Sequence, residues 1–311
     1  MSERYAIGTD VGGSHISAVL MDLEKGDIIQ DTFSTQKINN KDTAENILSR
    51  WALAIKETIG DVNPDELSGI GFAMPGPFDY EQGIALFERV DKYESLYGVN
   101  IGERLGSLLG MKRSVPFRFM NDATSFAVGE SWVGKAAEYK RSVAITLGTG
   151  FGSAFIESGI PVLDRDDVPE MGCVWHLPFK EGIADDYFST RWFINSYKEK
   201  TGKVMPGVKE IAYEALSDGL AAGLFREFGT NLGEFLGPWL KRFNAECLVI
   251  GGNMTGAIDL FGPFMELAFK QLPVDIDIHL SELKETAAMV GSARLMKADF
   301  WNDVKPLLTK M

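Results

Sequence analysis

Tyr5-Ala-Ile-Gly-Thr-Asp-Val-Gly-Gly-Ser14 is the stretch around which the rest of the sequence can be interpreted. Its first half is apolar, as in a strand, and leads through Asp10 into a turn of two glycines and a serine. Residues 16–21 are apolar again and predict a second strand. Because glycine lacks a Cβ, the N–H groups of such a turn can approach a phosphate closely. An ordinary β-hairpin with a Gly-Gly turn fits equally well, so this stretch alone leaves both interpretations open.

Composition sets the broad class of the protein. A chain of 311 residues corresponds to two domains at about 100–200 residues each. The formal net charge is −13, which excludes a broad electrostatic attraction to nucleic acid or to an anionic membrane. Two cysteines, Cys173 and Cys247, are too few for a disulfide framework. With no signal segment and no long apolar run, we expect a cytoplasmic protein without nucleic-acid or membrane partners.

The hydrophobic pattern predicts strands first and then alternating strands and helices, which indicates an α/β fold with a mixed sheet. Strands are expected at residues 4–10, 15–22, near 28–35, 67–74, 115–120, 142–147, 153–156 and 246–250. Helices are expected at residues 42–59 and 100–109, from 121, over most of 183–243, after 256 and at 287–301.

A faint internal repeat links two parts of the chain. Ala6-Ile-Gly-Thr-Asp-Val-Gly-Gly-Ser-His-Ile-Ser-Ala-Val-Leu20 is similar to Ala144-Ile-Thr-Leu-Gly-Thr-Gly-Phe-Gly-Ser-Ala-Phe-Ile156. Both consist of a strand, a Gly-rich turn with Gly-Thr beside it, and a second strand. Two such halves would bind a nucleotide between them, although chance similarity of two Gly-rich hairpins is the alternative.

The glycine motifs match no standard nucleotide fingerprint. Gly148-Thr-Gly-Phe-Gly152 has neither the spacing nor the following helix of a dinucleotide site, and the chain contains no P-loop sequence. Gly251-Gly-Asn253 follows a buried-looking strand. There the glycines let a ligand approach the backbone, or they allow close packing of helix on strand.

Two groups of polar residues are candidates for chemistry on a substrate that carries hydroxyl groups. Asn121 and Asp122 lie where a strand meets a helix, so they are either helix caps or a general base that takes a hydroxyl proton. Glu170 and Asp185 lie in an acidic loop region, as acceptors for a polyhydroxylated substrate or as solvated side chains. His176 follows Cys173 without further ligands nearby, which is short of a zinc site.

In this order, six motifs resemble those of the ROK family (repressor, open reading frame, kinase), whose fold belongs to the actin, Hsp70 and sugar-kinase superfamily. The motifs are Asp10-Val-Gly-Gly-Ser14, Ile70-Gly-Phe-Ala-Met-Pro-Gly-Pro-Phe-Asp79, Asn121-Asp-Ala with Gly129-Glu130, Leu147-Gly-Thr-Gly-Phe-Gly-Ser153, Leu248-Val-Ile-Gly-Gly252 and Ala288-Met-Val-Gly-Ser-Ala293. The resemblance implies a two-lobed actin-like ATPase fold of the ribonuclease H type, with a cleft between the lobes. Residues 1–120 plus 295–311 would form the smaller lobe, and residues 121–294 the larger lobe.

By the same resemblance, the chain is a glucokinase-like kinase that transfers the γ-phosphoryl group of ATP to a hydroxyl of a hexose or aminosugar. Asp122 would be the general base, and Asp10 would lie beside Mg²⁺ through water. The implied ATP-binding residues are Asp10, Gly12, Gly13, Ser14, Gly148, Thr149, Gly150, Gly251 and Gly252. The implied sugar-binding residues are Asn121, Gly76, Glu170, Cys173 and Asp185. Family members are often homodimers, so a homodimer is expected here.

The sequence also departs from the family pattern. Cys173 stands where the family has a histidine after Glu-x-Gly, and the cysteine-rich zinc loop is missing, so no zinc site is expected. Residues 90–95 replace a more usual Asn-Leu. These changes keep a non-catalytic sugar or nucleotide sensor as the alternative. A repressor of the same family is disfavoured, because the first strand begins by residue 5 and leaves no room for a helix-turn-helix domain.

Overall fold

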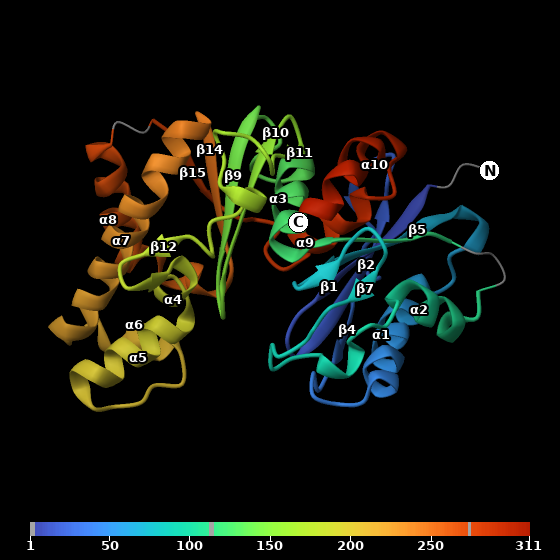
Figure 1. Cartoon of the computed structure of the whole chain (residues 1–311), viewed down its shortest axis with the longest axis horizontal. Helices are drawn as coiled ribbons and strands as arrows, with labels where there is room; N and C mark the ends of the chain where they lie inside the picture. Colours follow the sequence, from blue (N-terminus) through green and yellow to red (C-terminus); the bar gives the residue numbers. More distant parts are fainter. Residues whose placement is uncertain (1–3, 112–114, 273–274) are drawn as a thin grey trace. The chain divides into compact units, whose positions relative to one another are not determined.

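The computed structural model describes residues 4–111, 115–272 and 275–311. The chain forms two compact units, which Figure 1 shows in sequence colours. Unit 1 consists of Met1–Ala137, Gly159–Pro161 and Glu285–Met311, and unit 2 consists of Glu138–Ser158 and Val162–Lys284.

The division between these units differs from the one that the sequence suggests. Residues 121–137 and 285–294 were expected in the second lobe, but they belong to unit 1. They carry the helices α3 (Asp122–Val133) and α9 (Thr286–Arg294), which pack against each other, and α9 also packs on the sheet of unit 1. Both helices are therefore part of the core of the first unit.

The sheet of unit 1 is mixed, as predicted. Its strands are β1 (Tyr5–Val11), β2 (His15–Asp22), β3 (Asp27–Ile28), β4 (Ser34–Lys37), β5 (Leu67–Met74) and β8 (Phe117–Asn121). They lie in the order β3-β2-β1-β5-β8, and β4 also pairs with β2. β1 pairs antiparallel with β2 and parallel with β5, and β8 runs parallel to β5.

One face of this sheet is covered by α1 (Ala44–Ile59) and α2 (Ile101–Leu109). The helix expected at 42–59 is confirmed as α1, and its buried side chains form one core with those of β5. Trp51 of α1, for example, is fully buried, and its ring centroid lies 6.5 Å from that of Phe72.

Helix α9 lies so close to its neighbours that glycine is required at the contacts. A Cβ atom on Gly71 of β5 would lie 1.9 Å from the carbonyl oxygen of Ser292. A Cβ atom on Gly291 of α9 would lie 1.8 Å from the carbonyl oxygen of Ser125 in α3. Backbone therefore packs directly on backbone at both contacts.

We expect Gly71→Ala to lower the free energy of unfolding by about 3 kcal/mol or more, because the new methyl group meets main-chain atoms that cannot rotate away. Urea denaturation measures this change. Gly223→Ala is the matched control. Residue 223 lies within a helix, and its Cβ would meet nothing within 4 Å, so this change should be neutral or stabilise by up to about 1 kcal/mol. Equal stabilities of the two variants would contradict the close packing.

Unit 2 contains a second mixed sheet and a group of helices (Figure 1). Its strands are β9 (Arg141–Leu147), β10 (Phe151–Glu157), β14 (Cys247–Gly251) and β15 (Asp277–Leu280), and a hairpin is formed by β12 (Pro178–Phe179) and β13 (Gly182–Ile183). Its helices are α4 (Ala184–Tyr187), α5 (Thr190–Thr201), α6 (Val208–Glu214), α7 (Gly219–Phe243) and α8 (Ile258–Gln271). The strands lie in the order β10-β9-β14-β15.

The internal repeat is confirmed in the strand pairing. In unit 1, β1 pairs antiparallel with β2 and parallel with β5. In unit 2, β9 pairs antiparallel with β10 and parallel with β14. The two Gly-rich turns therefore occupy the same position in the two units, between the first and second strands.

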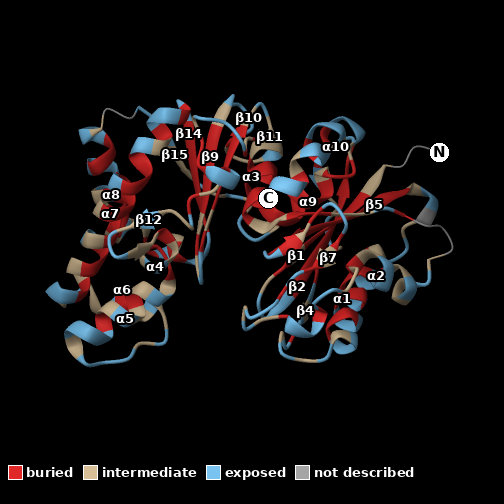
Figure 2. Ribbon diagram, viewed as in Figure 1, coloured by how far each residue is buried: buried red, intermediate tan, exposed pale blue. Residues whose placement is uncertain are grey.

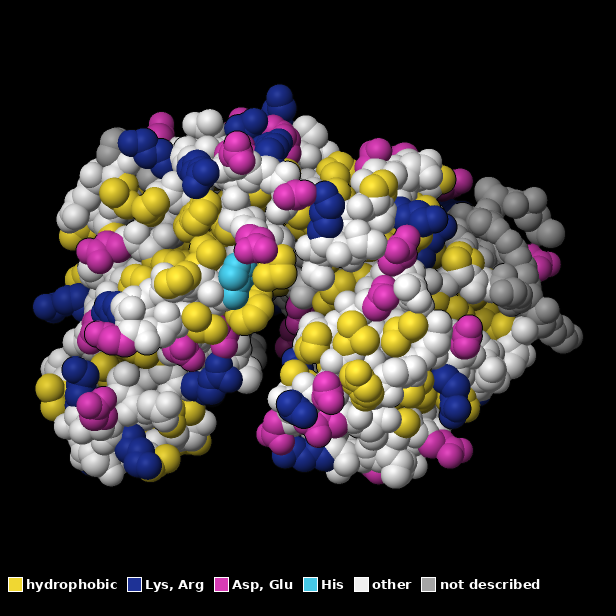
Figure 3. All heavy atoms as spheres, viewed as in Figure 1, with side chains coloured by type: hydrophobic (Ala, Val, Ile, Leu, Met, Phe, Trp, Pro, Cys, Tyr) yellow, Lys and Arg dark blue, Asp and Glu magenta, His cyan; other side chains and the backbone are white. Residues whose placement is uncertain are grey.

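Burial follows the layers of each unit: the strands are largely buried, and the outward faces of the helices are exposed (Figure 2). On the face drawn in Figure 3, acidic and basic side chains are mixed on both units rather than gathered by sign. Within the described residues, no helix combines the length and the apolar character that crossing a membrane demands.

Three expected elements were wrong in detail. The third strand near 28–35 is two short strands, because β3 and β4 pair with opposite ends of β2 and Asp31 turns the chain at φ 66°. The helix expected at 287–301 ends at Arg294, where a tighter turn follows, and α10 (Ala298–Val304) then begins. β15 was not predicted, because its four residues alternate polar and apolar side chains too briefly to be distinguished from a loop.

Candidate active site

The turn between β1 and β2 leaves two backbone amides open. The N–H of Gly12 donates to the carbonyl of His15 at 2.9 Å, and the carbonyl of Gly12 accepts a hydrogen bond from the Tyr93 hydroxyl. Gly13 and Ser14 are exposed, and neither N–H has an acceptor among residues 4–111, 115–272 and 275–311. Successive free amides at an open turn suit an anionic oxygen, such as that of a phosphate.

The turn between β9 and β10 has the same pattern. The N–H of Gly148 donates to the carbonyl of Gly150 at 3.1 Å. The carbonyl of Gly148 accepts two hydrogen bonds from Thr190, one from its N–H at 2.8 Å and one from its hydroxyl at 2.9 Å. Thr149 and Gly150 are exposed, and their N–H groups find no acceptor in the part of the chain that the structure describes.

In both turns, a held carbonyl directs an open amide. The carbonyl of one residue and the N–H of the next belong to one planar peptide unit and point in opposite directions. A hydrogen bond to the Gly12 carbonyl therefore fixes the direction of the Gly13 N–H. The bonds from Thr190 to Gly148 fix that of the Thr149 N–H in the same way.

Gly251 and Gly252 lie at the same edge of the second sheet as this turn. Gly251 ends β14 beside Thr146 of β9, and Gly252 has φ +86°. A Cβ atom on Gly252 would lie 2.3 Å from the carbonyl oxygen of Leu147, so the pair allows the backbone after β14 to pass directly over the end of β9. Their contact with adenosine stays a prediction.

Asn121 and Asp122 take different parts at the junction of β8 and α3. Asn121 is the N-cap: its Oδ1 accepts from the N–H of Thr124 at 3.1 Å, and its Nδ2 donates to the hydroxyl of Tyr80 at 3.3 Å. Asp122 is the first helical residue, and its Oδ1 accepts from the N–H of Ala123 at 2.8 Å. The capping alternative thus holds for Asn121, which leaves the carboxylate of Asp122 free of that task.

Tyr80 connects this junction to the Gly76 turn. Its hydroxyl donates to the carbonyl of Met74, at the end of β5, at 3.2 Å. The same hydroxyl would lie 3.5 Å from a Cβ on Gly76, whose bond to Pro77 is cis. Gly76 and Asn121 therefore lie beside the same hydroxyl, and their contact with a sugar stays a prediction.

The carboxylates of unit 1 influence one another. Burial raises the pKa of Asp122, whereas its hydrogen bond from Ala123 and the positive charge of Lys92 lower it. Burial, followed by the negative charges of Asp122 and Glu285, raises the pKa of Asp10 to about 7. A carboxyl group with a pKa of about 7 is only half ionised at neutral pH, and a nearby cation would favour its charged form.

Asp10 is the residue that the resemblance places beside a divalent cation, through water. No group of three His, Cys, Asp or Glu side chains within the described residues could hold a metal by itself. The place of Asp10 beside Mg²⁺ stays a prediction.

Asp185 has a contact that the sequence did not predict. Its Oδ1 accepts from the N–H of Phe151 at 2.7 Å, and its Oδ2 accepts from the guanidinium of Arg191 at 2.5 Å. The carboxylate therefore supports the end of the second turn. A sugar contact would have to share oxygens that already have partners.

The remaining predicted sugar residues lie in the loop that precedes β12. Glu170 is exposed at the start of a 3-10 helix, Glu170–Gly172. The thiol of Cys173 lies 3.8 Å from Nδ1 of His176, and burial raises the pKa of this thiol to about 11. The neutral thiol is a poor metal ligand. The roles of Glu170 and Cys173 toward a sugar stay predictions.

Four further residues belong to this description and were missed from sequence: Tyr93, Thr190, Lys92 and Glu285. Residues 90–95 stood out as a departure from the family pattern, which is the one signal for Tyr93 and Lys92. Nothing in the local sequence distinguishes Thr190 or Glu285 from ordinary helix-start residues.

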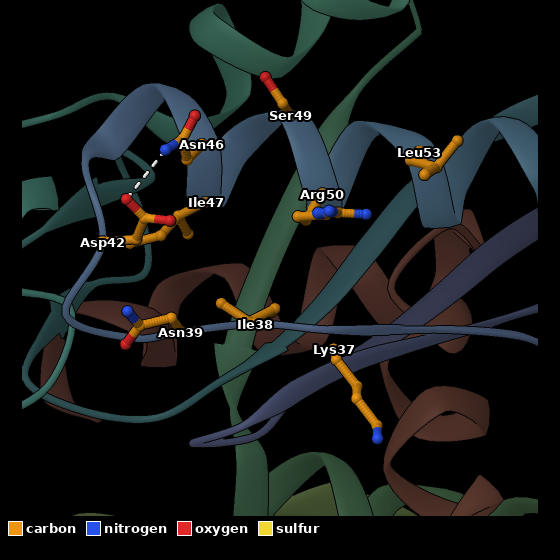
Figure 4. Close-up of a pocket in the computed structure, with 9 residues that line it drawn as sticks. All are labelled: Lys37, Ile38, Asn39, Asp42, Asn46, Ile47, Ser49, Arg50 and Leu53. Carbon is orange, nitrogen blue, oxygen red and sulfur yellow. Dashed lines mark hydrogen bonds between the residues drawn. The ribbon is translucent and has the colours of Figure 1, made fainter.

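A cavity of about 570 Å³ lies on unit 1 between β4 and α1 (Figure 4). It is lined by Lys37, Ile38, Asn39, Asp42, Asn46, Ile47, Ser49, Arg50 and Leu53. None of the predicted site residues is among them, but the N–H of Ile38 donates to the carbonyl of Ser14 at 2.8 Å, so the cavity adjoins the first turn.

Comparison with known proteins identifies the family. The model of the ROK family matches residues 6–299. The chain belongs to the ROK family. A solved ROK family glucokinase from Streptomyces griseus, in complex with glucose and AMPPNP, superposes with a TM-score of 0.72 at 22% identity, covering 94% of this chain and 98% of that one. This similarity confirms the predicted actin-like α/β fold.

Its relatives include both kinases and repressors. A glucokinase from Thermotoga maritima is 27% identical, with 96% of this chain and 98% of the relative covered. An N-acetyl-D-glucosamine kinase from Pectobacterium atrosepticum is 24% identical over 82% of this chain and 85% of its own. A xylose repressor from Bacillus spizizenii is also 24% identical, with 97% and 79% covered.

We expect Asp10→Asn to stabilise the protein increasingly as pH rises from 5 to 8. A carboxyl group with a pKa of about 7 when folded, against 3.8 ordinarily, holds its proton better in the folded state. Folding stability is therefore lost as pH rises toward 7, and the neutral amide avoids this loss. Urea denaturation at several pH values measures the difference, with the exposed Asp61→Asn as control. A difference independent of pH would contradict the raised pKa.

Proposed function

We propose that this protein is an ATP-dependent sugar kinase that transfers the γ-phosphoryl group of ATP to a hydroxyl of a hexose or aminosugar. The observation that carries the proposal is the matched pair of turns, each with two open amides and a held carbonyl. A nucleotide triphosphate offers several anionic oxygens, which two such turns suit better than one. The kinase names among the relatives point the same way.

In the proposed reaction, Asp122 accepts the proton of the sugar hydroxyl as its oxygen attacks the γ-phosphorus. The bond from phosphorus to the β-phosphate oxygen breaks, giving ADP, a sugar phosphate and a proton on Asp122. Mg²⁺, when bound, neutralises part of the phosphate charge. Burial raises the pKa of Asp122, which makes its carboxylate a stronger base than an exposed one.

The open amides of the two turns would stabilise charge on the phosphate oxygens. Those at Gly13 and Ser14 serve one group of oxygens, and those at Thr149 and Gly150 serve another. Such donors act without reorganisation when their carbonyls are already held in place. A cytoplasmic location and a homodimer stay predictions from composition and from the family.

We expect Asp122→Asn to lower kcat about 10²- to 10⁴-fold, because an amide cannot accept the hydroxyl proton. Release of ADP with glucose and with N-acetylglucosamine measures the reaction, and calorimetry measures AMPPNP binding, which should change little. Asp61→Asn serves as control. Unchanged turnover in Asp122→Asn would remove Asp122 from the mechanism.

Lys92 should set the acidic limb of the pH profile. Its positive charge lowers the pKa of Asp122, so Lys92→Met should raise that pKa. On acidification, kcat/KM of the variant should then begin to fall at a higher pH than that of wild type. The exposed Lys56→Met should leave the profile unchanged. A Lys92→Met profile identical to that of wild type would show that this charge does not act on the base.

The second candidate is a non-catalytic sugar or nucleotide sensor. It is favoured by the altered sugar loop, in which Cys173 stands in place of the family's histidine and residues 90–95 replace the usual Asn-Leu. Sugar binding without ADP release, under conditions in which AMPPNP also binds, would support the sensor over the kinase.

A further inference from the structure

The first turn is part of a closed ring of hydrogen bonds. The Tyr93 hydroxyl donates to the carbonyl of Gly12, and the Tyr93 N–H donates to the carbonyl of Asn40 at 2.8 Å. The side chain of Asn40 in turn donates to the carbonyl of Gly13 at 2.6 Å. Three segments that are distant in sequence are therefore joined at this turn.

The ring acts on the two open amides. The carbonyls of Gly12 and Gly13 share their peptide units with the N–H groups of Gly13 and Ser14. Tyr93 therefore sets the direction of the first open amide, and Asn40 sets that of the second. The N–H groups that would bind a phosphate are therefore oriented by residues outside the turn.

Tyr93 is held firmly enough to do this. Its side chain is fully buried, and its ring centroid lies 5.7 Å from that of Trp51 and 5.6 Å from that of Phe87. Its backbone is left-handed, with φ +56°. Burial also raises the pKa of its hydroxyl, which therefore stays protonated and able to donate to a carbonyl.

The same segment extends toward the candidate base. Residues 91–95 line a cavity of about 200 Å³ together with Asn40 and Lys41. Asp91 pairs with Lys41 at 2.9 Å, and the neighbouring Lys92 is the positive charge that acts on Asp122. Tyr93 thus lies between a group that acts on the base and the turn that offers the amides.

We propose that Tyr93 is a positioning residue that couples the nucleotide turn at Gly12–Ser14 to the segment 91–95, so that nucleotide binding stabilises this segment against local opening. The inference rests on the proposed function, because it needs the turn to bind nucleotide. Coupling requires the hydroxyl, since it is the group that joins the buried ring to the Gly12 carbonyl. The second turn is the internal comparison, because its Gly148 carbonyl is held by Thr190 of its own unit.

The experiment compares wild type with Tyr93→Phe and with the control Tyr97→Phe, whose side chain is exposed on the same stretch. Calorimetry measures AMPPNP binding with Mg²⁺, and hydrogen exchange measures protection of residues 90–98 with and without saturating AMPPNP. Loss of one hydrogen bond should weaken AMPPNP binding about three- to tenfold in Tyr93→Phe. AMPPNP should protect residues 90–98 in wild type and in Tyr97→Phe but not in Tyr93→Phe.

A purely structural role would lower the melting temperature of Tyr93→Phe and leave the AMPPNP-dependent protection intact, which would overturn the coupling. If Tyr93→Phe does not fold, Asn40→Ala removes the other bond to the turn, from the half-buried Asn40 side chain to the Gly13 carbonyl, and should reduce the AMPPNP-dependent protection in part. Failure of wild type to bind AMPPNP would refute the proposed function itself. If wild type binds AMPPNP and Tyr93→Phe shows the same binding and the same protection, the coupling is refuted and the proposed function is not.

Discussion

The packing of helix α9, backbone on backbone, is the constraint on which the arrangement of unit 1 depends. Gly8 of β1 meets the carbonyl of Met289 as closely as Gly71 meets that of Ser292. The buried hydroxyl of Ser292 also accepts from the N–H of Thr9 at 3.1 Å and donates to its carbonyl at 3.0 Å. Because Asp10 follows directly, this contact fixes the strand end on which the candidate site is built.

The same arrangement recurs at the Gly-rich turn of each unit. A Gly-rich turn alone would be free to rotate its peptide units, and its amides would point in many directions. Here, residues outside each turn hold the carbonyls: Tyr93 binds that of Gly12, and Thr190 binds that of Gly148. The open amides are therefore directed before any ligand arrives, which removes part of the ordering cost of binding.

Much of this could be predicted from sequence because it is local. The strands around both turns follow from apolar runs interrupted by glycine, and the choice at 121–122 was limited to cap or base. The contacts of Tyr93 could not be predicted, since the residue lies 81 positions from Gly12 and no spacing rule links them. The part taken by Asp185 was missed for the same reason, because an acidic side chain in a loop gives no sign of which backbone amide it will meet.

The two turns differ in how readily a substitution would alter them. Gly148 is bound partly through the main-chain N–H of residue 190, which every amino acid except proline retains. Gly12 is bound through a phenol, which exists only while residue 93 is tyrosine. A single base substitution in the codon of residue 93 could therefore change how the first turn is held in a descendant protein, while the second turn stays as it was.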